Sequence, residues 1–318
     1  MLPINNTEVK MSDKARIGGR LLRSLKRDYC LYLIALPVIA YFVLFKYAPM
    51  YGLVIAFMRY SPFKGISGST WIGFQNFQTF FNSVYFFRLL RNTALISLYN
   101  LIFSFPVPII LALLFNELKN QKFKKLVQTI SYLPHFISTV VVVSMITTIL
   151  NSYNGIVNNV MASMGMTRID FLQRPEMFRP IYIVSGIWQN AGWNSIIYLA
   201  AIAGVSPELY EAATIDGADR FQRVIYITFP AIIPTITILF IMNIGGFMTV
   251  GFEKILLMYN ELTYETADVI STYVYRKGIL SNEFGYSTAV DMFNAVINLV
   301  LLASTNLFCK KISDTSLW

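Results

Sequence analysis

The sequence has few of the side chains that carry chemistry in most enzymes. It contains one histidine and two cysteines, Cys30 and Cys309, in 318 residues. Neither cysteine has the spacing of a metal-binding pair, so we expect no metal site and no disulfide. No lysine precedes a serine or threonine, which excludes a Walker A phosphate loop, and no Gly-x-Ser-x-Gly elbow occurs. We therefore expect no catalytic residue and no bound cofactor.

Charge is also scarce. Only 14% of the residues are charged, whereas 55% are hydrophobic and the mean hydropathy is +0.54. A soluble domain carries about 25% charged residues. Residues 126–167, 180–207 and 224–252 contain no Lys, Arg, Asp or Glu. The basic residues behind the net charge of +9 are spread among the intervening segments, so we expect membrane lipid and no nucleic acid as a partner.

The apolar runs predict an all-α integral membrane protein with six transmembrane helices. The first run is short for a bilayer, which needs about 20 apolar residues, but Lys46 can snorkel and let Tyr51–Phe57 extend it. The predicted spans are Tyr29 to about Phe45, Asn92–Phe115, Val127–Leu150, Ile181–Ala203, Phe229–Phe252 and Ser287–Cys309.

The distribution of basic residues predicts which side of the membrane each segment faces. With six spans both termini lie on one side, which has fifteen Lys and Arg in short segments, against eleven in longer segments on the other. The positive-inside rule then makes both termini cytoplasmic. We divide the chain into a basic cytoplasmic segment, 1–28, and one six-span domain, 29–318.

A polar hairpin at about 205–230 separates the fourth and fifth spans. Ser206 suits an N-cap, Pro207 fits the first helical turn, and Gly217 permits a left-handed turn before a second helix. Ala212 and Ala213 leave one flank of the first helix nearly bare, which suits docking into a groove of another protein.

This hairpin carries a family resemblance. Glu211-Ala212-Ala213, Asp216-Gly217-Ala218, Phe221, Ile227 and Pro230 resemble the EAA loop of permease subunits of ATP-binding-cassette (ABC) importers. The resemblance implies the type I ABC importer permease fold and a cytoplasmic helix that docks on an ATPase subunit. The implied ATPase-coupling residues are Glu211, Ala212, Ala213, Asp216 and Gly217. The alternative is an ordinary surface hairpin between two helices.

Uncharged polar and aromatic side chains in the spans are candidates for a solute path, because a polyhydroxylated solute needs neutral donors and acceptors beside aromatic faces. Helix packing explains the same residues equally well in the fourth span, and better for Ser144, Thr147 and Thr148 in the third. The candidates are Gly186, Asn190, Trp193, Asn194, Asn243 and Phe247.

Two titratable residues lie within or beside the spans. We interpret His135 as a structural histidine rather than a proton relay. Asp291, in the first turns of the sixth span, is better explained by interface solvation or a structural partner than by transport.

The resemblance covers nearly the whole chain after residue 28. Segments 47–52, 73–77, 92–93 and 132–138 are similar to the carbohydrate branch of these permeases, above all to oligosaccharide or polysaccharide permeases served by lipoprotein binding proteins. It implies a bacterial cell-membrane importer of an oligosaccharide or related sugar. The implied partners are a second permease, usually a paralogue, two cytoplasmic ATPases that bind ATP and Mg, and an external solute-binding lipoprotein.

Three other classes remain open. An ion-coupled secondary transporter or channel for a neutral solute is the main alternative, and uptake independent of ATP hydrolysis would support it. A membrane glycosyltransferase would need acidic or metal-binding residues at a membrane face. A structural membrane subunit would show no change in solute selectivity when the fourth span is altered.

Overall fold

The computed structural model describes residues 27–313, 316 and 317, which fall into two parts, 27–54 and 55–317. The predicted basic segment, 1–28, therefore lies outside the described residues apart from its last two. Within the described chain all regular structure is helical except for one two-stranded ribbon. The prediction of an all-α protein is confirmed.

The first predicted span is longer than its first apolar run. Helix α2, Tyr29–Phe42, continues through a π-helical turn, Val43–Tyr47, into α3, Ala48–Met50, and a 3₁₀ segment, Tyr51–Phe57. Together they form a 29-residue apolar helix, Tyr29–Phe57. The expected extension past Lys46 is confirmed.

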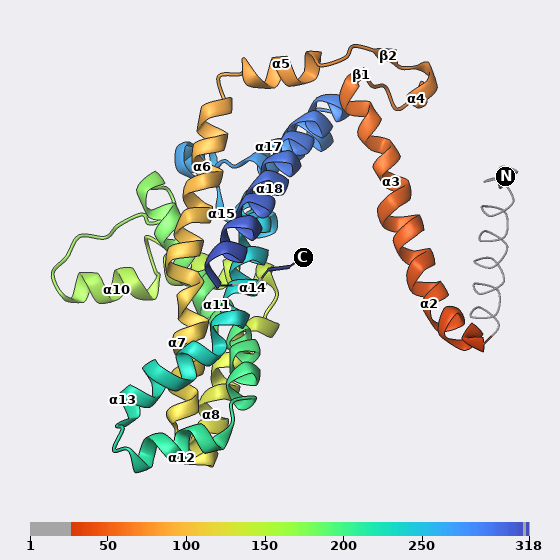
Figure 1. Ribbon diagram of the computed structural model, residues 1–318. Coiled ribbons are helices and arrows are strands. Elements are labelled where there is room, and N and C mark those ends of the chain that lie inside the picture. The colour runs from red at the N-terminus through yellow and green to blue at the C-terminus, as the bar shows by residue number, and fades with distance from the viewer. Residues whose placement is uncertain (1–26, 314–315, 318) are drawn as a thin grey trace, which may run out of the picture. The chain divides into compact units, whose positions relative to one another are not determined.

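A small cap of short elements follows this helix. Strands β1, Met58–Arg59, and β2, Thr70–Trp71, pair antiparallel around α4, Gly65–Gly68, and lead into α5, Gln75–Phe81. Asn76 on α5 donates to the carbonyls of Ala56 and Met58, at 2.8 and 3.2 Å. In the second part of the chain this cap lies at the end opposite α12 and α13, the two helices of the polar hairpin (Figure 1).

Three further long helices run through the second part of the chain. The first joins α6, Phe86–Tyr99, to α7, Pro106–Glu117, through a π-helical turn, Asn100–Ser104. The others are α11, Pro175–Ala203, and α18, Phe284–Ser313. Helices α6–α7 and α18 are long and apolar enough to cross a membrane as single segments, and α11 meets the same test together with the bent hairpin helix α12.

The fifth span differs from its predicted bounds at both ends. Helix α13, Arg220–Arg223, a π-helical turn, Val224–Thr228, and α14, Phe229–Gly245, form one continuous 26-residue helix. The predicted end at Phe252 is wrong, because the helix stops at Gly245-Gly246, where two adjacent glycines favour the helix least. The six residues that follow are apolar but not regularly helical.

The third span is broken, so the prediction of one helix over Val127–Leu150 is wrong. Helix α8, Gln121–Tyr132, is followed by a 3₁₀ turn, Leu133–Phe136, and by α9, Thr139–Ile149, which is bent by 99° from the preceding segment. Pro134 lacks the N–H that would continue the helix. Counting this pair and the pair α11–α12, bent by 72°, as one span each gives six candidate spans.

The connection between α14 and α18 is held by a buried ionic cluster. It consists of α15, Phe252–Met258, a 3₁₀ turn, Glu261–Thr263, α16, Tyr264–Ala267, α17, Ile270–Tyr275, and a π-helical turn, Arg276–Leu280. The carboxylate of Asp268 is fully buried and pairs with Arg276 at 2.6 Å and Arg88 at 3.2 Å. Asn92 donates to the carbonyl of Asp268 at 3.0 Å. A buried carboxylate needs such partners, and here they attach the connection to α6.

Helix α10, Ile156–Ser163, lies in the loop between α9 and α11. Three apolar clusters form the core around the long helices. One of them joins α6, α11 and α15 through Ile96, Tyr182 and Ile255. Another joins α7, α11 and α14 through Ile109, Tyr198 and Ile232. Helix α11 is thus central to the core, with polar side chains left on another part of its surface.

Candidate solute cavity and coupling hairpin

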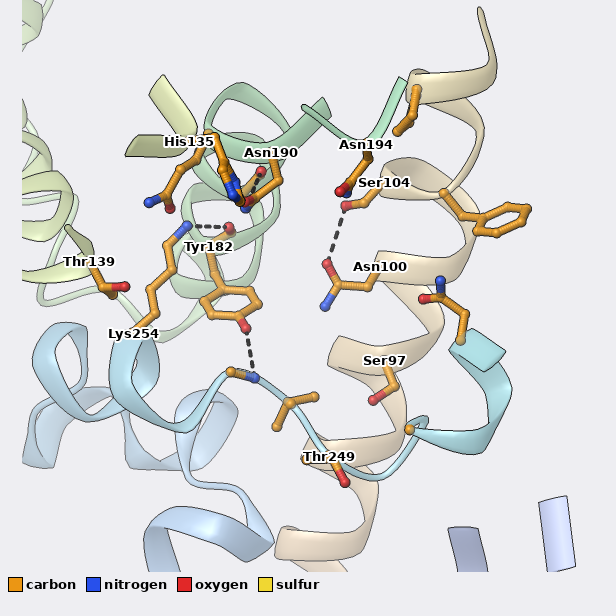
Figure 2. A pocket seen from close by; sticks show the side chains of 18 of the residues that line it. Ser97, Asn100, Ser104, His135, Thr139, Tyr182, Asn190, Asn194, Thr249 and Lys254 are labelled. Carbon is orange, nitrogen blue, oxygen red and sulfur yellow. Dashed lines mark hydrogen bonds between the residues drawn. The ribbon is translucent and has the colours of Figure 1, made fainter. Parts of the chain in front are cut away.

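A cavity of about 910 Å³ lies among α6–α7, α11, α14, the broken segment of the third span and the irregular segment after α14. Figure 2 shows polar side chains from these elements pointing into one space. Its polar and charged lining residues are Ser97, Asn100, Ser104, His135, Ser138, Thr139, Tyr182, Gln189, Asn190, Asn194, Tyr198, Asn243, Thr249, Glu253 and Lys254.

Helix α11 holds the broken segment in place. Gln189 donates to the carbonyl of Ile137 at 3.0 Å, and the His135 ring stacks on Trp193 with centroids 4.8 Å apart and planes 2° apart. A Cβ on Gly192 would lie 2.0 Å from the Ser131 carbonyl oxygen, so only glycine allows this approach of α8 to α11. These contacts hold the broken segment against α11, and the Gln189 bond satisfies the carbonyl of Ile137 just after the 3₁₀ turn.

The hydrogen bonds of Asn190 indicate which ring nitrogen of a neutral His135 carries the proton. Asn190 Nδ2 donates to the Gly186 carbonyl at 3.2 Å, which leaves its Oδ1 as the acceptor facing His135. Nδ1 of His135 lies 3.1 Å from that oxygen and so carries a proton (Figure 2). In a neutral ring Nε2 is then the acceptor. The structural interpretation of His135 is incomplete, because the same residue also lines the cavity.

The wide π-helical turn of α6–α7 presents an amide and a hydroxyl to the cavity. Ser104 donates to Asn100 Oδ1 at 3.2 Å, and the two side chains lie on the same side of the helix in Figure 2. Ser97, one turn earlier, donates to the carbonyl of Phe247. Single π-helical turns inside α-helices are frequently found at functional sites.

Residues 246–251 form a stretch of irregular backbone beside the cavity. Two of its N–H groups have partners on other helices: Met248 donates to Asn298 Oδ1 at 2.8 Å, and Gly251 donates to the Tyr182 hydroxyl at 3.1 Å. In membrane proteins irregular backbone is tolerated where it is buried in protein or lines a water-filled cavity. The end of α14 at Gly245 therefore exposes main chain to the cavity.

The cavity contains a cation, although the neighbouring segments 180–207 and 224–252 carry no Lys, Arg, Asp or Glu. Lys254 is only 8% exposed, and its Nζ donates to the Tyr182 carbonyl at 3.3 Å and lies 5.2 Å from the Tyr182 ring (Figure 2). Burial lowers the pKa of Lys254 to about 8. The sequence places Lys254 nine residues after Gly245, and only the early end of α14 brings it to the cavity.

The structure brings most of the predicted path residues together. Gly186, Asn190, Asn194, Asn243 and Phe247 all line the cavity. Trp193 is not a lining residue, and it contacts the cavity through its stack on His135. Whether any of them contacts a solute stays a prediction.

Sequence reasoning left out several lining residues. Ser97, Asn100 and Ser104 line the cavity from one face of a helix that was predicted only as an apolar span. Tyr182, Gln189 and Lys254 also line it, but no sequence pattern singled them out. The three- and four-residue spacing of Ser97, Asn100 and Ser104 could have identified them.

Other candidate polar residues lie elsewhere. The hydroxyls of Thr147 and Thr148 donate to carbonyls of their own helix, those of Val143 and Ser144, and neither residue lines the cavity. Asp291 is exposed on α18 and does not line the cavity. Within the described residues no group of three His, Cys, Asp or Glu side chains could hold a metal ion.

The polar hairpin begins with α12, Pro207–Ile215. Ser206 occupies the N-cap position, but its side chain makes no capping hydrogen bond, so the expected capping role is wrong. The N–H of Leu209 donates instead to the main-chain carbonyl of Ser206 at 3.2 Å. Gly217 has φ +81°, which confirms the expected left-handed turn. Ala218 donates to Ala213 at 2.8 Å and Gly217 to Thr214 at 3.2 Å, which is a Schellman motif.

Side-chain bonds brace the hairpin. Asp219 and Gln222 form a reciprocal capping box at the start of α13, with both bonds 2.8 Å long. Arg223 donates to the Thr214 hydroxyl at 2.8 Å, and the Tyr210 and Thr228 hydroxyls lie 3.0 Å apart. Helix α12 is therefore fixed against the start of the 26-residue helix.

The predicted coupling residues lie on the surface of this hairpin. Glu211, Ala212, Asp216 and Gly217 are exposed, and Ala213 is half-buried. A bend of 72° separates α12 from α11. The hairpin thus presents a short helix across the end of the bundle (Figure 1).

A helical protein with four to six candidate membrane spans, a polar cavity among the helices of its second part and a braced polar hairpin at one end of that part has the architecture of a transporter permease. The family model for the binding-protein-dependent transport system inner membrane component matches residues 104–314, and the chain belongs to this family. It is a multi-pass membrane permease subunit, and ATP hydrolysis in such a system resides in partner subunits.

Individual relatives are similar over almost their full length. The chain is 44% identical over 301 residues to Protein LplB of Bacillus subtilis, covering 95% of each chain. It is 46% identical over 299 residues to the polygalacturonan/rhamnogalacturonan transport system permease protein YteP of the same species, covering 94% of this chain and 93% of the relative.

A solved structure has the same fold. It is a chain of a bacterial alginate ABC transporter in complex with an alginate pentasaccharide-bound periplasmic protein, with a TM-score of 0.87 and 46% identity. The match covers 94% of this chain and 100% of that chain. The prediction of an ABC importer permease fold is confirmed.

Proposed function

We propose that this permease carries an oligosaccharide or a related sugar through the membrane by alternating access. The observation that supports this most directly is the chemistry of the cavity, in which amides and hydroxyls outnumber charges and stand beside aromatic rings. Small-molecule sites have volumes of about 300–1,000 Å³. A cavity of about 910 Å³ lies near the upper end of that range. The relatives that transport polygalacturonan, rhamnogalacturonan or alginate support the same solute class.

The proposed solute path follows α11 and the end of α14. The side-chain amides of Asn194 and Asn243 line the cavity. The Asn190 amide is already engaged, because its oxygen faces His135 and one of its N–H groups donates to the Gly186 carbonyl. Trp193 acts through the orientation of the His135 ring. The Nε2 lone pair of His135 is then an acceptor for a sugar hydroxyl.

The proposed coupling site is the exposed surface of α12 around Glu211, Ala212 and Ala213. Its turn, at Asp216 and Gly217, keeps α12 braced against the long helix that ends beside the cavity. In this arrangement the hairpin and both termini are cytoplasmic, and the hairpin docks on one of two ATPase subunits that bind ATP and Mg. The other partners are a second permease, a paralogue of this one, and an external solute-binding lipoprotein.

Reconstitution tests this function. Proteoliposomes that hold the complete complex should accumulate a labelled oligosaccharide only with its binding protein outside and ATP inside. Asn194→Leu should lower uptake several-fold, because it removes an amide and inserts an apolar branch into the cavity. Thr148→Val, on a residue outside the cavity, is the matched control and should transport as the wild type does. Uptake that continues without ATP hydrolysis would contradict the proposal.

A further inference from the structure

Lys254 is the most unusual residue of the cavity, because it is a buried cation with no anionic partner among the described residues. Lysine is almost never fully buried unless it is paired. The ion pairs among the described residues are Arg27–Asp28, Arg88–Asp268, Arg276–Asp268 and Lys277–Glu283, and Lys254 belongs to none of them. Its neighbour Glu253 also lines the cavity but is exposed and makes no ion pair with it.

The surroundings leave the ammonium open toward the cavity. Of its three N–H donors, one is used by the Tyr182 carbonyl at 3.3 Å. Opposite it, α11 has a glycine: a Cβ on Gly186 would lie 3.7 Å from Nζ, and a larger side chain would extend into the space beside the cation. No other hydrogen-bond partner of Nζ occurs in the described part of the chain, so two donors remain for a ligand.

A purely structural role would not require a charge here. A neutral donor of similar length could bond the Tyr182 carbonyl and pack on its ring without the desolvation cost of an ammonium. That cost is visible in the lowered pKa of about 8, which still leaves most of the lysine protonated at neutral pH. A buried cation that faces a cavity is compensated when a ligand brings the opposite charge.

We propose that Lys254 binds a carboxylate of the transported sugar, and that the solute is an acidic, uronate-bearing oligosaccharide. The inference rests on the proposed function and adds the charge of the substrate and the residue that selects it. Carboxylates accept charge-assisted hydrogen bonds, which are roughly twice as strong as neutral ones. The amides and hydroxyls around the cavity would then serve the sugar hydroxyls.

The test compares an acid with its own neutral ester in the complete reconstituted complex. The probes are trigalacturonate and trimannuronate and the methyl ester of each, which have nearly the same size and hydroxyl pattern. The variants are Lys254→Met, which keeps the length of the side chain without the charge, and Lys254→Arg, which keeps the charge. Lys277→Met, on a half-buried lysine paired with Glu283 outside this cavity, is the matched control.

We expect the wild type to take up at least one acid faster than its ester. Lys254→Met should lower the acid-to-ester uptake ratio at least about tenfold, because this is the scale of one charge-assisted hydrogen bond. Lys254→Arg should keep most of the ratio, and Lys277→Met should keep all of it. Equal losses of acid and ester uptake in Lys254→Met would make the lysine structural and overturn the inference. Preference of the wild type for neutral oligosaccharides would also overturn it but leave the proposed function intact, whereas failure to transport any oligosaccharide would remove both.

Discussion

Replacing Gly217 by valine should uncouple transport from ATP hydrolysis without unfolding the protein. Gly217 has φ +81°, and a Cβ there would meet no atom within 4 Å. The cost of the substitution is therefore backbone strain alone, roughly 1–2 kcal/mol for a residue with a Cβ and at the upper end for a β-branched one. The turn can relieve that strain only by giving up the Ala218–Ala213 and Gly217–Thr214 bonds, which would re-aim α12.

The size of the effect follows from that strain. About 1.4 kcal/mol changes an equilibrium tenfold, so the ratio of correctly aimed to re-aimed hairpins should fall roughly five- to thirty-fold. Solute-stimulated ATP hydrolysis and uptake should fall by up to these factors, while the amount of complex in the membrane stays unchanged. Both activities are measured in reconstituted complexes with the ATPase in excess.

A second glycine provides the matched control. Gly165, after α10, has φ +78°, no atom within 4 Å of a Cβ, and the same pair of bonds, from Met166 to Met161 and from Gly165 to Ala162. Gly165→Val therefore imposes the same strain away from the hairpin and should retain coupled uptake. Gly217→Asn should recover much of the activity, because asparagine tolerates this conformation. Normal stimulated hydrolysis in Gly217→Val would refute the role of the hairpin.

Two further outcomes follow from the helix contact at Gly192 and from the cation in the cavity. Gly192→Ala should lower the melting temperature of the purified complex by several degrees, because its Cβ would lie 2.0 Å from the Ser131 carbonyl oxygen and overpacking costs about 1–3 kcal/mol. Gly186→Ala, whose Cβ meets only Lys254 Nζ at 3.7 Å, is the stability control, and equal melting temperatures would contradict the close contact. Raising the pH from 7 to 10 should lower the acid-to-ester uptake ratio of the wild type, since burial lowers the pKa of Lys254 to about 8 and the lysine loses its proton in this range. In Lys254→Arg the acid-to-ester uptake ratio should stay nearly constant over this pH range. The comparison separates the effect of Lys254 from that of the other titratable groups around the cavity, which are His135, Tyr182, Tyr198 and Glu253. Parallel pH profiles of the two proteins would count against a role for the lysine charge.

Hydropathy predicted the order of the candidate spans because each contains a long run without charge, and the predicted number of six is reached when each bent pair is counted as one span. It also predicted the extension of the first helix past Lys46, since the residues on both sides of that lysine are apolar. The turn at Gly217 was predictable because the left-handed conformation restricts which residue can occupy it. These features depend on local sequence.

The break in the third span and the end of the fifth were not predictable in the same way. A proline such as Pro134 is often tolerated within a membrane helix, and the bend of 99° is held by contacts from α11, including Gln189 to Ile137. Residues 247–252 are as apolar as the helix before them, so hydropathy continues where the helix stops. Lys254 was consequently assigned to a loop, although it lies in the cavity.

The helix from Arg220 to Gly245 is continuous, so it connects the hairpin mechanically to the backbone beside the cavity. At 1.5 Å per residue, its 26 residues span roughly 39 Å, from the braced turn to the irregular backbone beside the cavity. If the helix moves as a rigid rod, a tilt of about 10° at one end displaces the other by roughly 7 Å over this length. The wide turn at Val224–Thr228 and Pro234 are the places where such a rod could flex. Stiffening or loosening them would change how much of a small rotation at the hairpin reaches the residues around Phe247.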